Sequence, residues 1–336
     1  LLGCSLIYDD NDISKIDGQK SSDWLRKLID NTNKDKNILI KTRTSLAAYH
    51  NYNFLLARQN LTDHLSVNDR NNKIRQRLYK IRAKKVIIST GAIERPQVFH
   101  NNDRPGIMLA SAVKKYIDYY GVRCGLENVI FTNNDSAYEA ALSLHKSGTK
   151  INAIIDIRNN SSSEIVSKGK SLGVQIYWNH TIVDTKGYKR INKVTVMKLS
   201  NNGNDVVGEK IEFNCDCLAI SGGWTPMVHL FTQSGGKLKF DNKDNIFVPD
   251  KTNLNLLSIG SAKGDFELDD VLKNSIEDTK KFLKIESSNF DKIDVKCSKE
   301  KEKKNIWLLP SDKPLSKTKP FLDYQNDSTA KDIKLA

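Results

Sequence analysis

Residues 129–148, VIFTNNDSAYEAALSLHKSG, have the outline of a strand, a tight polar turn and a helix. The apolar run Val129–Phe131 precedes the turn, and an Ala/Leu-rich stretch continues to Gly148. A second apolar run, INAIIDIR (151–158), follows at the spacing expected of a βαβ unit. This unit constrains the fold strongly, because it requires parallel strands with a helix packed across them.

The turn lacks the glycines that nucleotide-binding βαβ units carry as G-x-G-x-x-G, since Thr132, Asn134 and Ala137 occupy these positions. The second glycine lets the backbone touch a pyrophosphate, and the third allows close packing of helix on strand. Asn134 fills the phosphate space, whereas Ala137 keeps the packing. Asp135 adds negative charge at the helix start, where we expect it to cap the helix instead.

We therefore favour a non-binding copy of a nucleotide fold over a working NAD site in this inner unit. Asp156 ends the next strand, about twenty residues on, where a ribose-binding acid would lie. Because the turn is altered, we interpret Asp156 as a remnant or a structural residue.

Alternating strand and helix patterns along the chain predict an α/β protein with parallel sheets. Helices are expected at 23–30 and 107–121, and a strand at 37–49. The strand 86–89 ends in Thr-Gly-Ala, and 254–264 reads as a strand entering a glycine turn before a long helix. These two features bracket the inner unit, a layout typical of Rossmann-type flavoproteins with two dinucleotide-binding domains, one inserted in the other.

Composition fits a globular protein: 336 residues are 38% hydrophobic and 28% charged, enough for two domains. No stretch approaches eighteen apolar residues, so we expect no membrane span. The net charge of +13 comes from scattered lysines, which argues against nucleic-acid binding. The opening LLGCSLIYDD resembles the middle of a protein, and the closing AKDIKLA stops within a helical pattern, so we suspect a fragment.

Residue types for catalysis and metal binding form no recognisable constellation. The five cysteines are sparse and odd in number, which favours reduced thiols in the cytoplasm. Strand alternation predicts that Cys215 and Cys217 point to one face of a sheet. The histidines lack metal-ligand spacing and no G-x-S-x-G is present, so we predict no catalytic residue and no metal. The charged run 296–305 is interpreted as a solvated linker.

Several long segments resemble the α subunit of heterotetrameric sarcosine oxidase, and the similarity covers nearly the whole chain. They are KVIISTGAIERPQVFHNNDRPGIMLASAV, VIFTNNDSAYEAALSLHKSG, CLAISGGWTPMVHLFTQSGGKLKF and FLDYQNDSTAKDI. The resemblance implies an NAD-binding α subunit that works with β, γ and δ subunits. It also implies FAD on the β subunit, FMN at the α/β boundary, and tetrahydrofolate in a C-terminal aminomethyltransferase-like domain.

The resemblance places NAD in the outer domain, whose glycine-rich turn would precede Leu1. It implies Ser5 beside the cofactor, the backbone near Leu46 against the adenine, and Thr90 and Gly91 in the crossover between domains. The late turn would be lined by three further residues: Gly260, Asp265 and Glu267.

The implied domain limits are 1–124 for the first part of the outer domain, 125–225 for the inner domain, 226–285 for the outer return, 286–310 for a linker and 311–336 for the start of a small domain. Two alternatives stay open. The chain could belong to a related heteromeric amino-acid or opine dehydrogenase, or it could be a structural scaffold that binds no nucleotide.

Overall fold

The computed structural model describes residues 14–287, 290, 292–300 and 302–336. Within these, the backbone forms two compact units. The first unit comprises the described parts of 14–93 and 225–297, and the second those of 94–224 and 298–336. The division after Ile93 lies earlier in the chain than the expected boundary at 124/125, and the domain limits stay a prediction.

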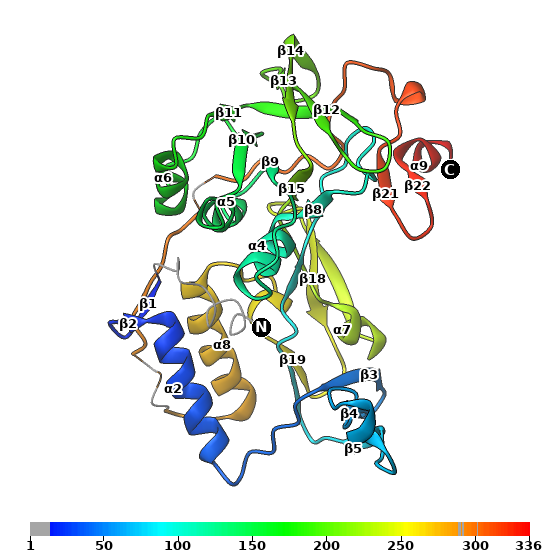
Figure 1. The fold of residues 1–336 in the computed structure, drawn as a ribbon. Helices are drawn as coiled ribbons and strands as arrows, with labels where there is room; N and C mark the ends of the chain where they lie inside the picture. Colours follow the sequence, from blue (N-terminus) through cyan, green and yellow to red (C-terminus); the bar gives the residue numbers. More distant parts are fainter. Residues whose placement is uncertain (1–13, 288–289, 291, 301) are drawn as a thin grey trace. The chain divides into compact units, whose positions relative to one another are not determined.

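The second unit is built on a parallel sheet of five strands in the order β11-β10-β9-β15-β8 (Figure 1). All four neighbouring pairs run parallel. The strands are β8 (Ile107–Leu109), β9 (Glu127–Thr132), β10 (Lys150–Asp156), β11 (Ile176–Trp178) and β15 (Cys217–Ser221). The predicted βαβ unit and its parallel pairing are thereby confirmed.

Two layers cover this sheet, three helices on one face and an antiparallel sheet on the other. The helices are α4 (Ala110–Asp118), α5 (Ala137–Lys146) and α6 (Glu164–Ser171), and the second sheet is β12 (His180–Lys186), β13 (Lys193–Leu199) and β14 (Val206–Asn214). Because successive side chains of a strand point to opposite faces, each strand of the parallel sheet contributes to two separate cores. Ile130 packs with the helices, whereas Val129 and Phe131 pack with Val194 and Val196 of β13.

The C-terminal segment of the second unit contains η2 (Leu315–Lys317), β21 (Phe321–Asp323), β22 (Ser328–Thr329) and α9 (Ala330–Leu335). The Asn102 amide anchors it, since Asn102 Nδ2 donates to the Phe321 carbonyl at 2.9 Å and the Phe321 N–H donates to Asn102 Oδ1 at 2.8 Å. Thr329 and Asp332 form a capping box at the start of α9.

The first unit contains several small sheets. Strands β3 (Thr44–His50), β4 (Phe54–Asn60) and β5 (Gln76–Arg82) form an antiparallel meander, and β6 (Val86–Ile88) pairs in parallel with β19 (Leu256–Ser258). The other strands are β1 (Lys15–Ile16), β2 (Gln19–Lys20), β17 (Lys237–Asp241), β18 (Ile246–Lys251) and β20 (Val295–Lys296). Its helices are α2 (Ser21–Lys34), α3 (Val67–Arg70), α7 (His229–Gln233), η1 (Gly260–Ala262) and α8 (Leu268–Leu283). Strands β7 (Ala92–Glu94) and β16 (Trp224–Pro226) lie where the chain passes from one unit to the other.

The prediction of a strand over 37–49 is wrong in its first half, because β3 begins only at Thr44. Leu39 is 80% exposed, and residues 38–40 lie outside the sheets that the structure describes. A strand needs neighbouring backbone to take its hydrogen bonds, so an apolar run alone does not form one.

The prediction that Cys215 and Cys217 share a face is also wrong. Strand β14 ends at Asn214 and β15 begins at Cys217, so the two thiols do not lie on one continuous strand. Cys215 packs in the core between the two sheets, and Cys217 in the core beneath the helices. Burial raises the pKa of both thiols to about 12.

Candidate functional site

The first unit brings two predicted cofactor segments to one edge of its parallel strand pair. Ser258 at the end of β19 is in register with Ile88 at the end of β6. Because the strands are parallel, the chain leaves both at the same edge, toward Thr90-Gly91 and toward Gly260. Ligands of open α/β sheets bind at this carboxyl edge.

Two glycines at this edge have left-handed backbones, Gly91 with φ 78° and Gly260 with φ 61°. Glycine adopts this conformation without steric strain, which explains the residue type. Around Gly91 the crossover is held by its own hydrogen bonds: Thr90 Oγ1 donates to the Met227 carbonyl at 3.0 Å, and the Met227 N–H donates to the Gly91 carbonyl at 2.9 Å.

The late turn, defined as Ser258–Glu267, contains buried polar atoms that lack a partner among the described residues. Ser258 Oγ and Asp265 Oδ2 have no hydrogen-bond partner among the described residues. Asp265 Oδ1 accepts from Asn274 Nδ2 at 3.1 Å, and burial raises the pKa of the Asp265 carboxyl. A buried acceptor without a donor costs stability, and a sugar hydroxyl could supply that donor.

The start of α8 does not fit a diphosphate. Glu267 is the N-cap residue, and its side chain makes no capping hydrogen bond. Asp269 and Asp270 add negative charge in the first turn. A helix N-terminus favours anions, but here the carboxylates of the chain already supply the negative charge. The late turn therefore fits ribose hydroxyls better than phosphate oxygens.

Leu46 lies on β3 and is partly buried against a core that includes Ile88 and Ala262. Of the sequence-predicted residues of the first unit, Thr90, Gly91, Gly260, Asp265 and Glu267 follow the carboxyl ends of β6 and β19, whereas Leu46 contacts the core that contains these strands. Ser5 lies outside the described residues. These assignments stay a prediction, because neither the fold nor its contacts identify a ligand.

In the second unit, the inner turn Thr132–Ser136 is filled by its own side chains. Asn134 Nδ2 donates to Ser221 Oγ at 2.8 Å and to Asn133 Oδ1 at 2.8 Å. Asn134 Oδ1 accepts from the Ser136 N–H at 3.0 Å, and the Thr132 hydroxyl donates to the Asn134 carbonyl at 2.8 Å. The amide groups thus bond to the turn and to the end of β15.

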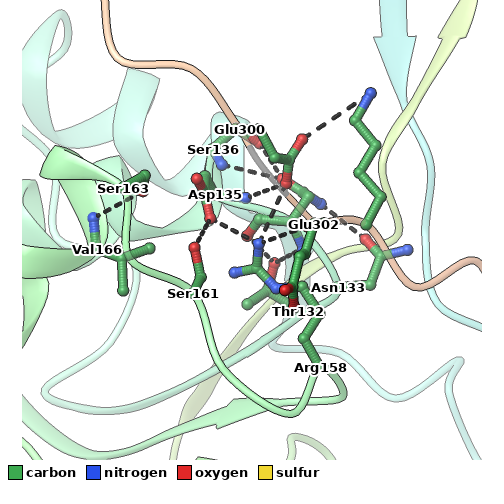
Figure 2. Close-up of polar contacts among 12 residues, drawn as sticks. Thr132, Asn133, Asp135, Ser136, Arg158, Ser161, Ser163, Val166, Glu300 and Glu302 are labelled. Carbon is green, nitrogen blue, oxygen red and sulfur yellow. Dashed lines mark hydrogen bonds and ion pairs between the residues drawn. The ribbon is translucent and has the colours of Figure 1, made fainter.

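A buried ion cluster lies beside this turn (Figure 2). The side chain of Arg158 is 1% exposed and contacts three carboxylates: Asp135 Oδ1 at 2.6 Å, Asp156 Oδ2 at 2.7 Å and Glu300 Oε1 at 3.3 Å. Burial lowers the pKa of the guanidinium, but the bonds and charge of Asp156 outweigh it and raise that pKa. The Tyr138 hydroxyl donates to Asp156 at 2.9 Å.

Two sequence interpretations are corrected by this cluster. Asp135 does not cap α5, because its carboxylate pairs with Arg158 and accepts from the Ser161 hydroxyl; Ser136 is the N-cap residue, without a side-chain cap. Glu300, in the run interpreted as solvated, has a side chain that is only 13% exposed. The sequence analysis did not identify Arg158 as a site residue. Its position at the end of the apolar run 151–158 was a signal that could have indicated a buried charge.

Other kinds of site find little support in the described part of the chain. No group of three metal-ligating side chains is found there. The described helices include none with the length and apolarity to cross a bilayer. A cavity of about 640 Å³ in the second unit is lined by His100, Asn202–Asn204, Lys304–Ser311, Lys313, Leu315, Thr318 and Pro320. These lining residues include none of the predicted cofactor residues.

The sheet order and the three layers define a Rossmann-type α/β fold. The crystal structure of T. acidophilum thioredoxin reductase is similar, with a TM-score of 0.53 at 17% identity, over 79% of this chain and 80% of that chain. The predicted fold class is confirmed.

Two curated relatives are more specific. The chain is 33% identical over 328 residues to sarcosine oxidase subunit alpha of Corynebacterium sp. (strain P-1), covering 95% of this chain and 33% of the relative. It is 29% identical over 330 residues to sarcosine oxidase subunit alpha of Rhizobium meliloti (strain 1021), covering 97% and 32%. The resemblance to the sarcosine oxidase α subunit is confirmed, and the chain spans about a third of the length of these relatives. No family model matches the chain.

Proposed function

We propose that the first unit carries an NAD site and that the chain is the NAD-binding segment of an oxidoreductase subunit of the sarcosine oxidase type. The observation that carries this proposal is the late turn. There, Gly260 adopts a left-handed backbone, and Ser258 Oγ and Asp265 Oδ2 are buried without a partner among the described residues. Unpaired polar atoms at the carboxyl edge of parallel strands are the expected state of a ligand site that awaits hydroxyl groups.

The chain's residues act in this proposal by binding and positioning. Asp265 accepts from a ribose hydroxyl, and Gly91 and Gly260 let backbone approach the cofactor closely. Glu267, at the start of α8, and Leu46, through the backbone of β3, complete the pocket together with Thr90 and Ser5. The glycine-rich turn that would hold the diphosphate belongs to a segment before Leu1, as the resemblance implies. NAD supplies hydride transfer when bound, and no residue of this chain is proposed as catalytic.

The activity of the whole enzyme is proposed from the relatives. Sarcosine, oxygen and tetrahydrofolate would give glycine, hydrogen peroxide and 5,10-methylenetetrahydrofolate. The chain would work in the cytoplasm in a heterotetramer with β, γ and δ subunits, with FAD on the β subunit and FMN at the α/β boundary. Tetrahydrofolate would bind a C-terminal domain beyond Ala336.

Calorimetric titration of the complete subunit with NAD tests the proposal. We expect one site per chain, and Asp265→Asn should weaken the affinity about tenfold, the effect of losing about 1.4 kcal/mol from one charged hydrogen bond. Asp270→Asn, an exposed carboxylate in the first turn of α8, is the matched control and should leave the affinity unchanged. A complete subunit that does not bind NAD would support the scaffold alternative instead.

A further inference from the structure

The lysine-rich segment 298–305, described except for residue 301, contacts the inner turn through a buried glutamate. Glu300 Oε1 accepts a hydrogen bond from the Asp135 N–H at 2.8 Å and lies 3.3 Å from Arg158 Nη1. Its side chain is 13% exposed, although the run around it is highly charged. The carboxylate therefore binds the backbone just before α5.

Two backbone carbonyls of the same segment extend this contact. The Glu302 carbonyl accepts from Arg158 Nη1 at 3.0 Å, and the Lys304 carbonyl accepts from Asn133 Nδ2 at 3.2 Å. Lys304 Nζ in addition donates to Asn179 Oδ1 at 3.1 Å. Figure 2 shows Glu300 and Glu302 beside Asp135, Asn133 and Arg158.

The position of this segment is the one that a dinucleotide takes in a binding lobe. Strands β9 and β10 end at Thr132 and Asp156, and a pyrophosphate would lie over these ends at the start of the following helix. A carboxylate offers the same kind of acceptor oxygens with less charge than a pyrophosphate. That lower charge suits a turn that already contains Asp135 and lies beside Asp156.

We propose that the described residues of 298–305 are an internal ligand of the inner turn, in which the Glu300 carboxyl group takes the place of a nucleotide phosphate and keeps the turn closed to dinucleotides. The occupant is a segment of this chain, and the contact lies within the second unit. It is independent of the NAD site proposed for the first unit.

The charges that face Glu300 make this contact sensitive to pH. Burial and the Asp135 carboxylate raise the pKa of Glu300 to about 7, while Lys303 and Arg158 oppose the shift. The Asp156 carboxylate also forms an ion pair with Arg158. Because this pKa is above the ordinary 4.5, the protonated Glu300 side chain stabilises the fold fully below pH 4.5. This contribution is lost as the pH rises through 7. The segment should thus bind more tightly at pH 6 than at pH 8.

Hydrogen–deuterium exchange on the intact chain, corrected for intrinsic rates, tests the proposal. In Glu300→Ala, peptides covering 298–305 and the Asp135 amide should exchange about tenfold faster, the effect of losing one buried hydrogen bond. Glu302→Ala is the control, because its contact uses the backbone oxygen and survives the substitution. Equal exchange in Glu300→Ala and wild type, or an equal effect in Glu302→Ala, overturns the proposal.

Glu300→Gln provides a second readout that does not depend on how well Glu300→Ala folds. The amide keeps an acceptor for the Asp135 N–H but cannot ionise, so protection of 298–305 should stay constant between pH 6 and pH 8. In the wild type it should fall over the same range. A wild-type profile as flat as that of Glu300→Gln overturns the pH-dependent contact.

Titration with NAD separates this inference from the proposed function. Glu300→Ala should bind NAD as the wild type does, since Glu300 is not part of the proposed site. An unchanged affinity with faster exchange at 298–305 supports the internal ligand. A loss of NAD binding in Glu300→Ala would contradict the independence of the two sites.

Discussion

The late turn of the first unit and the inner turn of the second unit have the same strand–turn–helix arrangement. They differ in the hydrogen bonding of their buried polar groups. Each follows a parallel strand and precedes a helix, as Gly260 follows β19 and Asn133 follows β9. At the late turn, Ser258 Oγ and Asp265 Oδ2 are buried without a partner among the described residues. At the inner turn, the side chain of Asn134 bonds to Asn133, Ser136 and Ser221.

This difference is the one expected between the proposed NAD site and a structural copy of such a site. A site that awaits a ligand keeps polar atoms available and bears their desolvation cost until the ligand arrives. The inner turn instead supplies its own partners, and Arg158 and Glu300 close it further, although Asp135 Oδ2 has no partner among the described residues. A nucleotide fold can thus lose its ligand while keeping its shape, provided that side chains replace the ligand's hydrogen bonds.

The largest expected effect comes from removing the cation of the closed turn. Arg158→Met keeps a similar volume but leaves Asp135, Asp156 and Glu300 without their counter-ion in a buried place. Breaking a buried ion pair by removing one partner costs about 3–5 kcal/mol. We expect a loss of this size in the free energy of unfolding of the second unit, measured by urea denaturation.

Lys168→Met is the matched control for that measurement, because Lys168 lies on α6 of the same unit and its side chain is 39% exposed. Its exposed pair with Glu164 should contribute less than about 0.5 kcal/mol. A change below about 1 kcal/mol in Arg158→Met would mean that the three carboxylates do not depend on this cation.

The layered fold was predictable because hydrophobic periodicity reports it directly. Val129, Ile130 and Phe131 alternate between two cores, and Ala137 at the helix start permits close packing. Strand limits were harder, since a strand depends on neighbours that sequence does not specify. The run 38–40 is as apolar as β6, yet lies outside the described sheets.

The two turns were predictable to different degrees. The closed state of the inner turn followed from Asn134 alone, because an amide side chain fills the space that a glycine leaves. The contact with Glu300 did not follow, because it joins residues 165 positions apart in the sequence. Long-range hydrogen bonds of this kind depend on the tertiary fold, and a charged run is interpreted as solvated until its path is known.

Two serines allow the comparison to be made with one substitution at each turn. Ser221 ends β15, and its hydroxyl accepts from Asn134 Nδ2 at 2.8 Å. Ser258 ends β19, and its hydroxyl has no partner among the described residues. Ser221→Ala should destabilise the second unit by about 1–3 kcal/mol, because it leaves a buried donor unpaired. Ser258→Ala should change the first unit by less than about 0.5 kcal/mol.

Thermal unfolding of both variants, followed by calorimetry, measures this contrast. If the loss in Ser258→Ala equals that in Ser221→Ala, the Ser258 hydroxyl has a structural partner, and its assignment to an open site fails. The two substitutions remove the same single atom, so their difference reports the hydrogen bond and not a change in packing volume.

The smallest expected effect concerns the unpaired carboxyl group of the late turn. Burial raises the pKa of Asp265 above its ordinary value of 3.8, so this group lowers the stability of the first unit as the pH rises through its folded pKa. Asp265→Asn removes the ionisation and should raise stability at pH 7 by a few tenths of a kcal/mol up to about 1 kcal/mol, because solvent screens part of the group. The gain should shrink as the pH falls and more of the wild-type carboxyl is neutral, whereas the exposed Asp270→Asn should show a weaker trend, because the Asp270 charge is a minor cause of the raised Asp265 pKa. Urea denaturation at pH 7 and at lower pH measures the difference. If Asp265→Asn gains stability while its NAD affinity falls, this residue serves binding at a cost to folding. The inner turn offers no such separation, because its polar groups stabilise the fold itself.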